Sequence, residues 1–124
     1  MASRAIQEGV GWRIGWDGEA PDYPGLLGGA DWALELTASE FQEVCRLAQQ
    51  LAQQMQAMAD LLMDEETLTC DAESDLAWVE ASGFPNDFAL RFILHSGRRC
   101  EGAWAVAATG QLLRAMDTVL TQPF

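Results

Sequence analysis

Residues 37–62 read TASEFQEVCRLAQQLAQQMQAMADLL, and this stretch decides the fold class. Its first four residues form a capping box, because the Thr37 hydroxyl can accept a hydrogen bond from the Glu40 amide while the Glu40 carboxylate reaches back. Apolar residues then recur every three or four positions, which is typical of an amphipathic helix. They are Phe41, Val44, Ala48, Leu51, Met55, Met58 and Leu62. The stretch therefore predicts one long helix with one face in a core.

The length and polar face of this helix raise the question of a second subunit. A helix of this length spans roughly 40 Å, more than a small sheet needs, so we expect a kink or an overhang. Residues 47–59 carry no charge, and the polar face there is all Gln. Two interpretations stay open: an ordinary solvated helix face, which we favour, and a surface partly covered in a dimer.

Short alternating stretches flank the helix and predict strands. Upstream, Gly11–Trp16 and Ala30–Leu36 plausibly form a hairpin across a loop that includes Glu19–Gly25. Downstream, four strands are expected, followed by a final helix over about 106–121. These strands are Thr67–Asp71, Leu76–Ala81, Phe88–His95 and Arg99–Trp104. The sequence thus predicts an α+β fold: an antiparallel sheet of about six short strands in ββαββββα order, with one long and one short helix packed on one face.

The last hairpin has a predictable register, because apolar residues must share a face. A three-residue loop over 96–98 pairs Leu94 with Cys100 and Leu90 with Trp104, whereas a two-residue loop would place charged side chains in the core. This register puts the chain's basic cluster on and beside the solvent face. The cluster consists of Arg91, His95, Arg98 and Arg99.

Two interpretations of this basic cluster are possible. Arg binds carboxylate or phosphate in a planar fork, so the cluster is a candidate site for an anion or a nucleic-acid backbone. Surface charges more often form structural ion pairs, and we favour that interpretation. The expected partners are Glu80, Asp87 and Glu101.

Length and charge narrow the class of protein. The chain has 124 residues, seven arginines, no lysine and 19 acidic residues, giving a formal net charge of −12. This length fits one domain over residues 1–124. Nothing resembles a signal peptide or a membrane span, so we expect a cytoplasmic protein without a membrane partner. The negative charge counts against nucleic acid but does not exclude it.

Seven acidic residues follow the long helix without any basic residue among them. Crowding the end of a helix with carboxylates opposes the macrodipole. Either the helix therefore stops by about Met63, which we favour, or a cation or a basic partner offsets the cost. The candidate partner surface comprises Asp60, Asp64, Glu65, Glu66, Asp71, Glu73 and Asp75.

Motifs for catalysis, cofactors and metals are absent. His95 is the single histidine, no nucleophile stands in a recognisable context, and no phosphate-loop pattern occurs. Three cysteines at wide spacing, Cys45, Cys70 and Cys100, predict reduced and mostly buried thiols rather than a metal site. The tryptophans, all on predicted strands, are expected mostly in the core. They are Trp12, Trp16, Trp32, Trp78 and Trp104.

Several short strings, in their order and spacing, resemble a known family along nearly the whole chain. They are Gly11-Trp12-Arg13, Tyr23 to Gly29, Trp32 to Thr37, Leu62 to Glu66 and Arg99 to Trp104. The chain is similar to the domain-of-unknown-function 1818 family of cyanobacteria and plastid-bearing plants. That resemblance implies a fold related to the Whirly and positive-cofactor-4 single-stranded-DNA-binding modules, which are often dimeric. Fold kinship alone does not carry function across.

These observations lead to a functional hypothesis with two alternatives. We expect a non-enzymatic accessory domain, a homodimer, that presents an acidic surface to a basic protein partner. The first alternative is a single-stranded nucleic-acid-binding module that uses the hairpin arginines. The second alternative is a small-molecule binder with an apolar pocket near His95.

Overall fold

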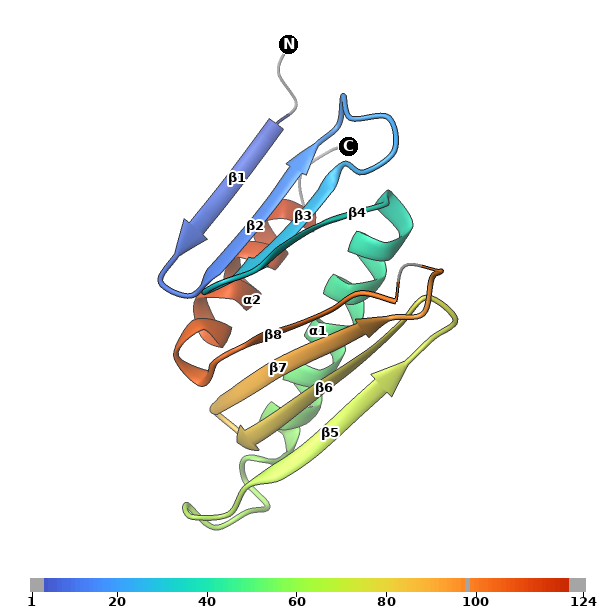
Figure 1. The fold of residues 1–124 in the computed structure, drawn as a ribbon. Coiled ribbons are helices and arrows are strands. Elements are labelled where there is room, and N and C mark those ends of the chain that lie inside the picture. The colour runs from blue at the N-terminus through green and yellow to red at the C-terminus, as the bar shows by residue number, and fades with distance from the viewer. Residues whose placement is uncertain (1–3, 98, 121–124) are drawn as a thin grey trace.

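Two four-stranded antiparallel sheets and two helices make up the computed structural model, which describes residues 4–97 and 99–120. The first sheet contains β1 (Arg4–Gly9), β2 (Trp12–Asp17), β3 (Gly25–Gly29) and β4 (Ala33–Leu36). The second contains β5 (Leu68–Glu73), β6 (Ala77–Phe84), β7 (Asp87–Leu94) and β8 (Glu101–Trp104). Each sheet is a meander in which strands adjacent in sequence pair. Consequently β1 and β5 lie at the outer edges, and β4 and β8 face each other between the sheets (Figure 1).

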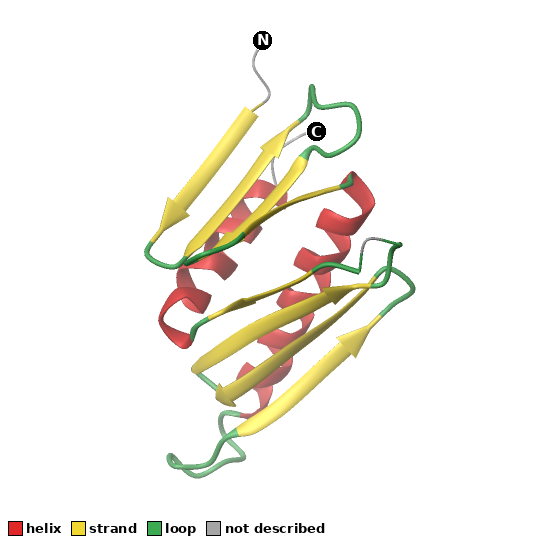
Figure 2. Cartoon of the chain, in the orientation of Figure 1, coloured by secondary structure: helices red, strands yellow, loops and turns green. Residues whose placement is uncertain are grey.

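Both helices, α1 (Ala38–Met58) and α2 (Val106–Leu120), lie on the same side of the two sheets (Figure 2). The α+β class and the packing of the helices on one side are therefore as predicted. The number of strands is eight rather than about six. No helix within the described ranges is both long and apolar enough to cross a membrane.

The two strands that sequence analysis missed, β1 and β3, both belong to the first sheet. β1 has little apolar alternation, and β3 reads GLLGG, a composition typical of loops. The predicted hairpin between the flanking stretches is wrong, because β3 pairs with both β2 and β4 and separates them. The predicted inward face of β2 is nevertheless confirmed, since Trp12, Ile14 and Trp16 are buried.

The long helix begins as its capping box predicts. The Glu40 amide donates to the Thr37 hydroxyl at 3.2 Å, and the Thr37 amide donates to the Glu40 carboxylate at 2.9 Å. The helix ends at Met58, with Ala59 as its cap, so it stops before the acidic residues that would oppose its dipole. α1 packs on β5 and β6 and also reaches β3 and β4. The second sheet therefore accounts for a helix longer than one small sheet needs.

The predicted register of the last hairpin is confirmed. Leu90 pairs with Trp104, and the Leu94 amide donates to the Cys100 carbonyl at 2.8 Å. The side chains of Phe88, Leu90, Phe92 and Leu94 are all buried. The opposite face of β7 is therefore left to Arg91 and Ile93.

A group of aromatic side chains joins the two sheets, and we call Trp32, Phe92 and Trp104 the tryptophan seam. The Trp104 ring lies 5.3 Å from Trp32 and 5.4 Å from Phe92, measured between centroids. The Trp104 indole N–H donates to the Gly28 carbonyl of β3 at 2.8 Å. In return, the Trp32 indole N–H donates to the Ala103 carbonyl of β8 at 3.0 Å. Both the ring contacts and the hydrogen bonds therefore cross the boundary between the sheets.

Candidate functional site

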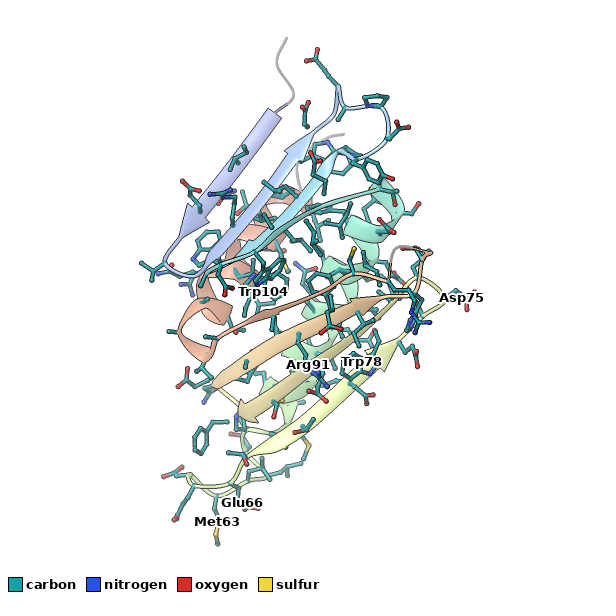
Figure 3. The ribbon with its side chains drawn as sticks, in the orientation of Figure 1. Met63, Glu66, Asp75, Trp78, Arg91 and Trp104 are labelled. Atoms are coloured by element: carbon teal, nitrogen blue, oxygen red, sulfur yellow. The ribbon has the colours of Figure 1, made fainter. Side chains whose placement is uncertain are left out.

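The outer face of the second sheet carries the basic residues that sequence analysis singled out. Arg91 projects from β7, next to Trp78 of β6 (Figure 3). The Arg91 Nε donates to the Glu80 carboxylate at 3.1 Å, and its guanidinium carbon lies 4.9 Å from the centre of a Trp78 ring. Arg91 is thus held by an ion pair and a cation–π contact at once. The favoured interpretation, a structural ion pair with Glu80, is confirmed for this residue.

Carboxylates from the edge strand β5 occupy the same face. The Glu73 carboxylate lies 2.6 Å from Nε2 of His95, and the Asp71 carboxylate accepts from the Trp78 indole N–H at 2.9 Å. Because these carboxylates face the bases of the cluster, they lower the positive potential that a phosphate would meet. We call this set the outer cluster. It consists of Asp71, Glu73, Trp78, Glu80, Arg91 and His95.

The remaining members of the basic cluster are less defined. Arg99 is exposed, follows the loop and has a backbone φ of 49°, which is the left-handed region. Arg98 lies outside the described residues. Among the described residues no ion pair is found for Asp87 or Glu101, the other two expected partners. The structure therefore assembles Arg91 and His95 with carboxylates and does not gather all four bases into one site.

The seven acidic residues extend along β5 rather than forming one compact cluster. Glu66 lies near the start of β5 and Asp75 beyond its other end, in the turn to β6 (Figure 3). Asp71 and Glu73 lie between them on the outer face, with the partners described above. The other four are exposed in the loop that joins α1 to β5. These four are Asp60, Asp64, Glu65 and Glu66.

Exposed apolar side chains accompany that loop, and sequence analysis missed them. Leu61 is 73% exposed and Met63 is 72% exposed, although both continue the apolar pattern of the helix. Phe84 at the end of β6 is 42% exposed and, with Met63, lines a small pocket of about 120 Å³. The helix ends at Met58, so these side chains fall outside its buried face. We call Asp60, Leu61, Met63, Asp64, Glu65, Glu66 and Phe84 the acidic-apolar end.

The Gln face of α1 borders a groove beside α2. Gln49, Gln53 and Gln56 contribute to two adjoining pockets of about 310 and 450 Å³, into which Leu113 and Arg114 of α2 also extend. Gln53 and Gln56 are exposed in the single chain. The homodimer therefore stays a prediction, with this groove as the surface that a second copy would have to cover.

A different pocket, of about 200 Å³, opens on the outer face of the first sheet. It forms where Gly15 of β2 leaves space between its neighbours. Its lining residues are Ile6, Gly15, Trp16, Asp17, Ala20, Tyr23, Pro24, Gly25, Leu26 and Glu35. Sequence analysis placed the only candidate pocket near His95, and His95 lines none of these four pockets.

Two groups on α1 have shifted pKa values. Hydrogen bonds from Arg46 and from Ser74 lower the pKa of the Glu43 carboxyl to about 2. Burial raises the pKa of the Cys45 thiol to about 12, so this thiol is neutral and unreactive at ordinary pH. All three cysteines are free, with Cys70 and Cys100 half-buried. Across residues 4–97 and 99–120, no group of three or more His, Cys, Asp or Glu could hold a metal ion.

Comparisons with known proteins agree with this geometry in offering no assigned activity. A search of curated proteins finds no match. The chain is similar to a crystal structure of a protein with unknown function from Prochlorococcus sp. NATL2A, described as a member of the DUF155 family. The two are 28% identical, with a TM-score of 0.88 over 94% of this chain and 98% of that one.

The kinship with Whirly and positive-cofactor-4 modules stays a prediction. The family resemblance itself is confirmed, because the family model described as "Domain of unknown function (DUF1818)" matches residues 7–119. This chain belongs to the DUF1818 family.

Proposed function

We propose that this chain is a non-enzymatic protein-interaction domain that binds a basic protein partner through its acidic-apolar end. The observation that carries the proposal is the exposure of Leu61 and Met63, each more than 70% accessible, among four carboxylates. Exposed apolar side chains rimmed by charge are typical of interaction sites. The apolar groups would supply the anchor, and the carboxylates would select a basic partner.

The loop that presents these side chains is held by its own hydrogen bonds. The Met63 amide donates to the Glu66 carboxylate at 2.9 Å, and the Glu66 amide donates to the Met63 carbonyl at 3.0 Å. A preformed loop loses less conformational entropy when a partner binds. This geometry supports binding of the loop as it stands.

The surrounding charge supports a basic partner. No Lys, Arg or His occurs between Arg46 and Arg91, a stretch that contains the whole acidic-apolar end. A cationic partner would therefore approach without local repulsion, and its association rate would fall with salt.

The nucleic-acid alternative has weaker support. Arg91 is already engaged by Glu80 and Trp78, and a phosphate would have to displace the carboxylate. Fluorescence anisotropy with a labelled single-stranded oligonucleotide tests it directly. Tight, salt-sensitive binding that Arg91→Ala abolishes would replace the present proposal with the nucleic-acid one.

The direct test is an NMR titration of the labelled domain with a Lys/Leu amphipathic helical peptide of about five turns. We expect shifts concentrated at residues 60–66 and at Phe84. Asp60→Asn, Asp64→Asn, Glu65→Gln should weaken binding at least about tenfold, because three rim charges are lost. Glu66 is left intact, since it holds the loop.

A matched variant separates local recognition from general attraction to a protein of charge −12. Asp22→Asn, Asp31→Asn, Asp117→Asn makes the same change in net charge at exposed positions elsewhere. Equal weakening in both triple variants would contradict the proposal. Leu61→Ser, Met63→Ser leaves the charge unchanged and should also weaken binding if the apolar side chains are the anchor.

A further inference from the structure

The pocket on the first sheet results from a glycine at an outward position. Alternation along β2 directs Trp12, Ile14 and Trp16 inward, so position 15 faces outward, yet Gly15 is buried. A Cβ built on Gly15 would lie 3.1 Å from Ile6 Cγ1 and 3.4 Å from Leu26 Cβ. These two side chains come from β1 and β3, which pair with β2 at this position. The backbone of Gly15 is therefore the floor, and Ile6 and Leu26 are apolar walls.

Polar and aromatic groups complete the rim of this pocket. Tyr23, 42% exposed, lines it from the loop between β2 and β3. Asp17 lines it from the end of β2, and Glu35 lines it from β4. Among the described side chains of the lining, none is basic. The pocket thus combines an apolar floor and an aromatic wall with two carboxylates.

This combination fits a particular chemical class. An anion would meet two carboxylates and the field of a protein with net charge −12. A neutral apolar molecule would leave the carboxylates partly desolvated without a partner. An organic ammonium ion offsets both costs, since its charge faces the carboxylates and its alkyl stem covers Ile6 and Leu26.

We propose that the pocket floored by Gly15 binds an ammonium group carried on a short apolar stem. The pocket volume of about 200 Å³ exceeds several times the share of one water molecule, about 30 Å³, so a stem of a few carbons fits. The site lies on the first sheet and shares no residue with the acidic-apolar end of the second. Failure of either proposal therefore leaves the other standing.

The test is an NMR titration of the full chain with n-butylammonium, n-butanol and butyrate, which differ chiefly in charge. We expect n-butylammonium to bind in the millimolar range, about tenfold more tightly than n-butanol, with shifts at residues 15, 23 and 26. The titration is repeated on Arg4→Ala, because Arg4 pairs with Asp17 and its guanidinium is a potential competitor. Absence of binding to both proteins overturns the proposal, as does equal binding of all three probes.

Variants locate the site. Asp17→Asn, Glu35→Gln should reduce n-butylammonium affinity at least about fivefold, while Asp31→Asn, Asp117→Asn, with the same change in charge, should not. Equal loss in the two pairs would overturn the proposal. Tyr23→Ala tests the aromatic wall in a loop residue and should weaken the ammonium probe more than the alcohol.

The source of the ammonium group is read from a further probe. Nα-acetyl-lysine N-methylamide carries the same stem on a peptide backbone. Binding as tight as that of n-butylammonium would assign the pocket to lysine side chains of a protein. Binding of the free amine alone would assign it to a small-molecule ammonium ligand.

Discussion

In the first sheet, the central outward row runs Ile6, Gly15, Leu26, Glu35, and in the second the matching row runs Asp71, Glu80, Arg91, Ala103. The strand order and pairing are the same in both meanders. A glycine at a middle position of the first row leaves a pocket, whereas Glu80 and Arg91 cover the middle of the second with an ion pair. One topology therefore yields an open face or a covered face according to the side chains at two central positions.

The largest expected effect comes from breaking the join between the two sheets. Trp104→Ala removes a fully buried ring that contacts Trp32 and Phe92 and donates to Gly28. We expect a loss of about 3–5 kcal/mol in the free energy of unfolding, measured by urea denaturation. Trp104→Phe keeps a ring and loses the hydrogen bond, so its loss should be smaller. A loss below about 1 kcal/mol for Trp104→Ala would mean that the seam does not couple the sheets.

The second effect tests the glycines of the first sheet. A Cβ on Gly25 would lie 2.6 Å from three atoms of the Phe41 side chain, so α1 or β3 would have to move. Gly25→Ala should cost about 1–3 kcal/mol through overpacking. Gly97→Ala in the last hairpin is the control, because a Cβ there has no neighbour within 4 Å. Equal stability of the two variants would show that the close approach of Gly25 is not needed.

A smaller effect is expected on the covered face. Arg91→Ala removes an exposed ion pair with Glu80 and the contact with Trp78, which together are worth about 0.5–1.5 kcal/mol. Arg91→Lys keeps the charge and should recover only part of the loss, since the planar stack is gone. Trp78 emission reports on the contact. An unchanged unfolding midpoint and spectrum in Arg91→Ala would contradict the role given to this pair.

The smallest effect appears as a pH dependence at the join of α1 to the second sheet. The lowered pKa of Glu43 means that its stabilising contribution is complete above the ordinary carboxyl pKa of 4.5 and is lost as pH falls toward about 2. Glu43→Gln should therefore lower the urea midpoint at pH 6 and have little effect near pH 2. A difference between the two proteins that stays constant across this range would exclude Glu43 as its source.

The second sheet was predictable from sequence, and the first was only partly so. β7 alternates cleanly, and placing Leu90 opposite Trp104 fixed the hairpin register before any coordinates. β3 escaped because its glycines have low strand propensity, although they are needed where Phe41 and Trp32 approach the backbone. Local propensity is a weak guide where tertiary packing selects a residue for its small size.

The candidate sites divide in the same way. The pairing of Arg91 with Glu80 was expected because their positions on neighbouring strands could be derived. The apolar part of the acidic-apolar end was hidden, since Leu61 and Met63 continue the helical pattern beyond the true end of α1. The pocket floored by Gly15 was hidden as well, because it depends on three strands, two of which sequence analysis missed.

The carboxylates on edge strand β5 also determine how the domain avoids polymerising. An edge strand offers unpaired backbone groups to any other chain, including a second copy of itself. If two β5 strands joined their sheets, Asp71 and Glu73 of one copy would stand beside the same carboxylates of the other on one continuous face. That repulsion disfavours open-ended growth at neutral pH, and it would fade in acid, where fibrous self-assembly would then start at β5.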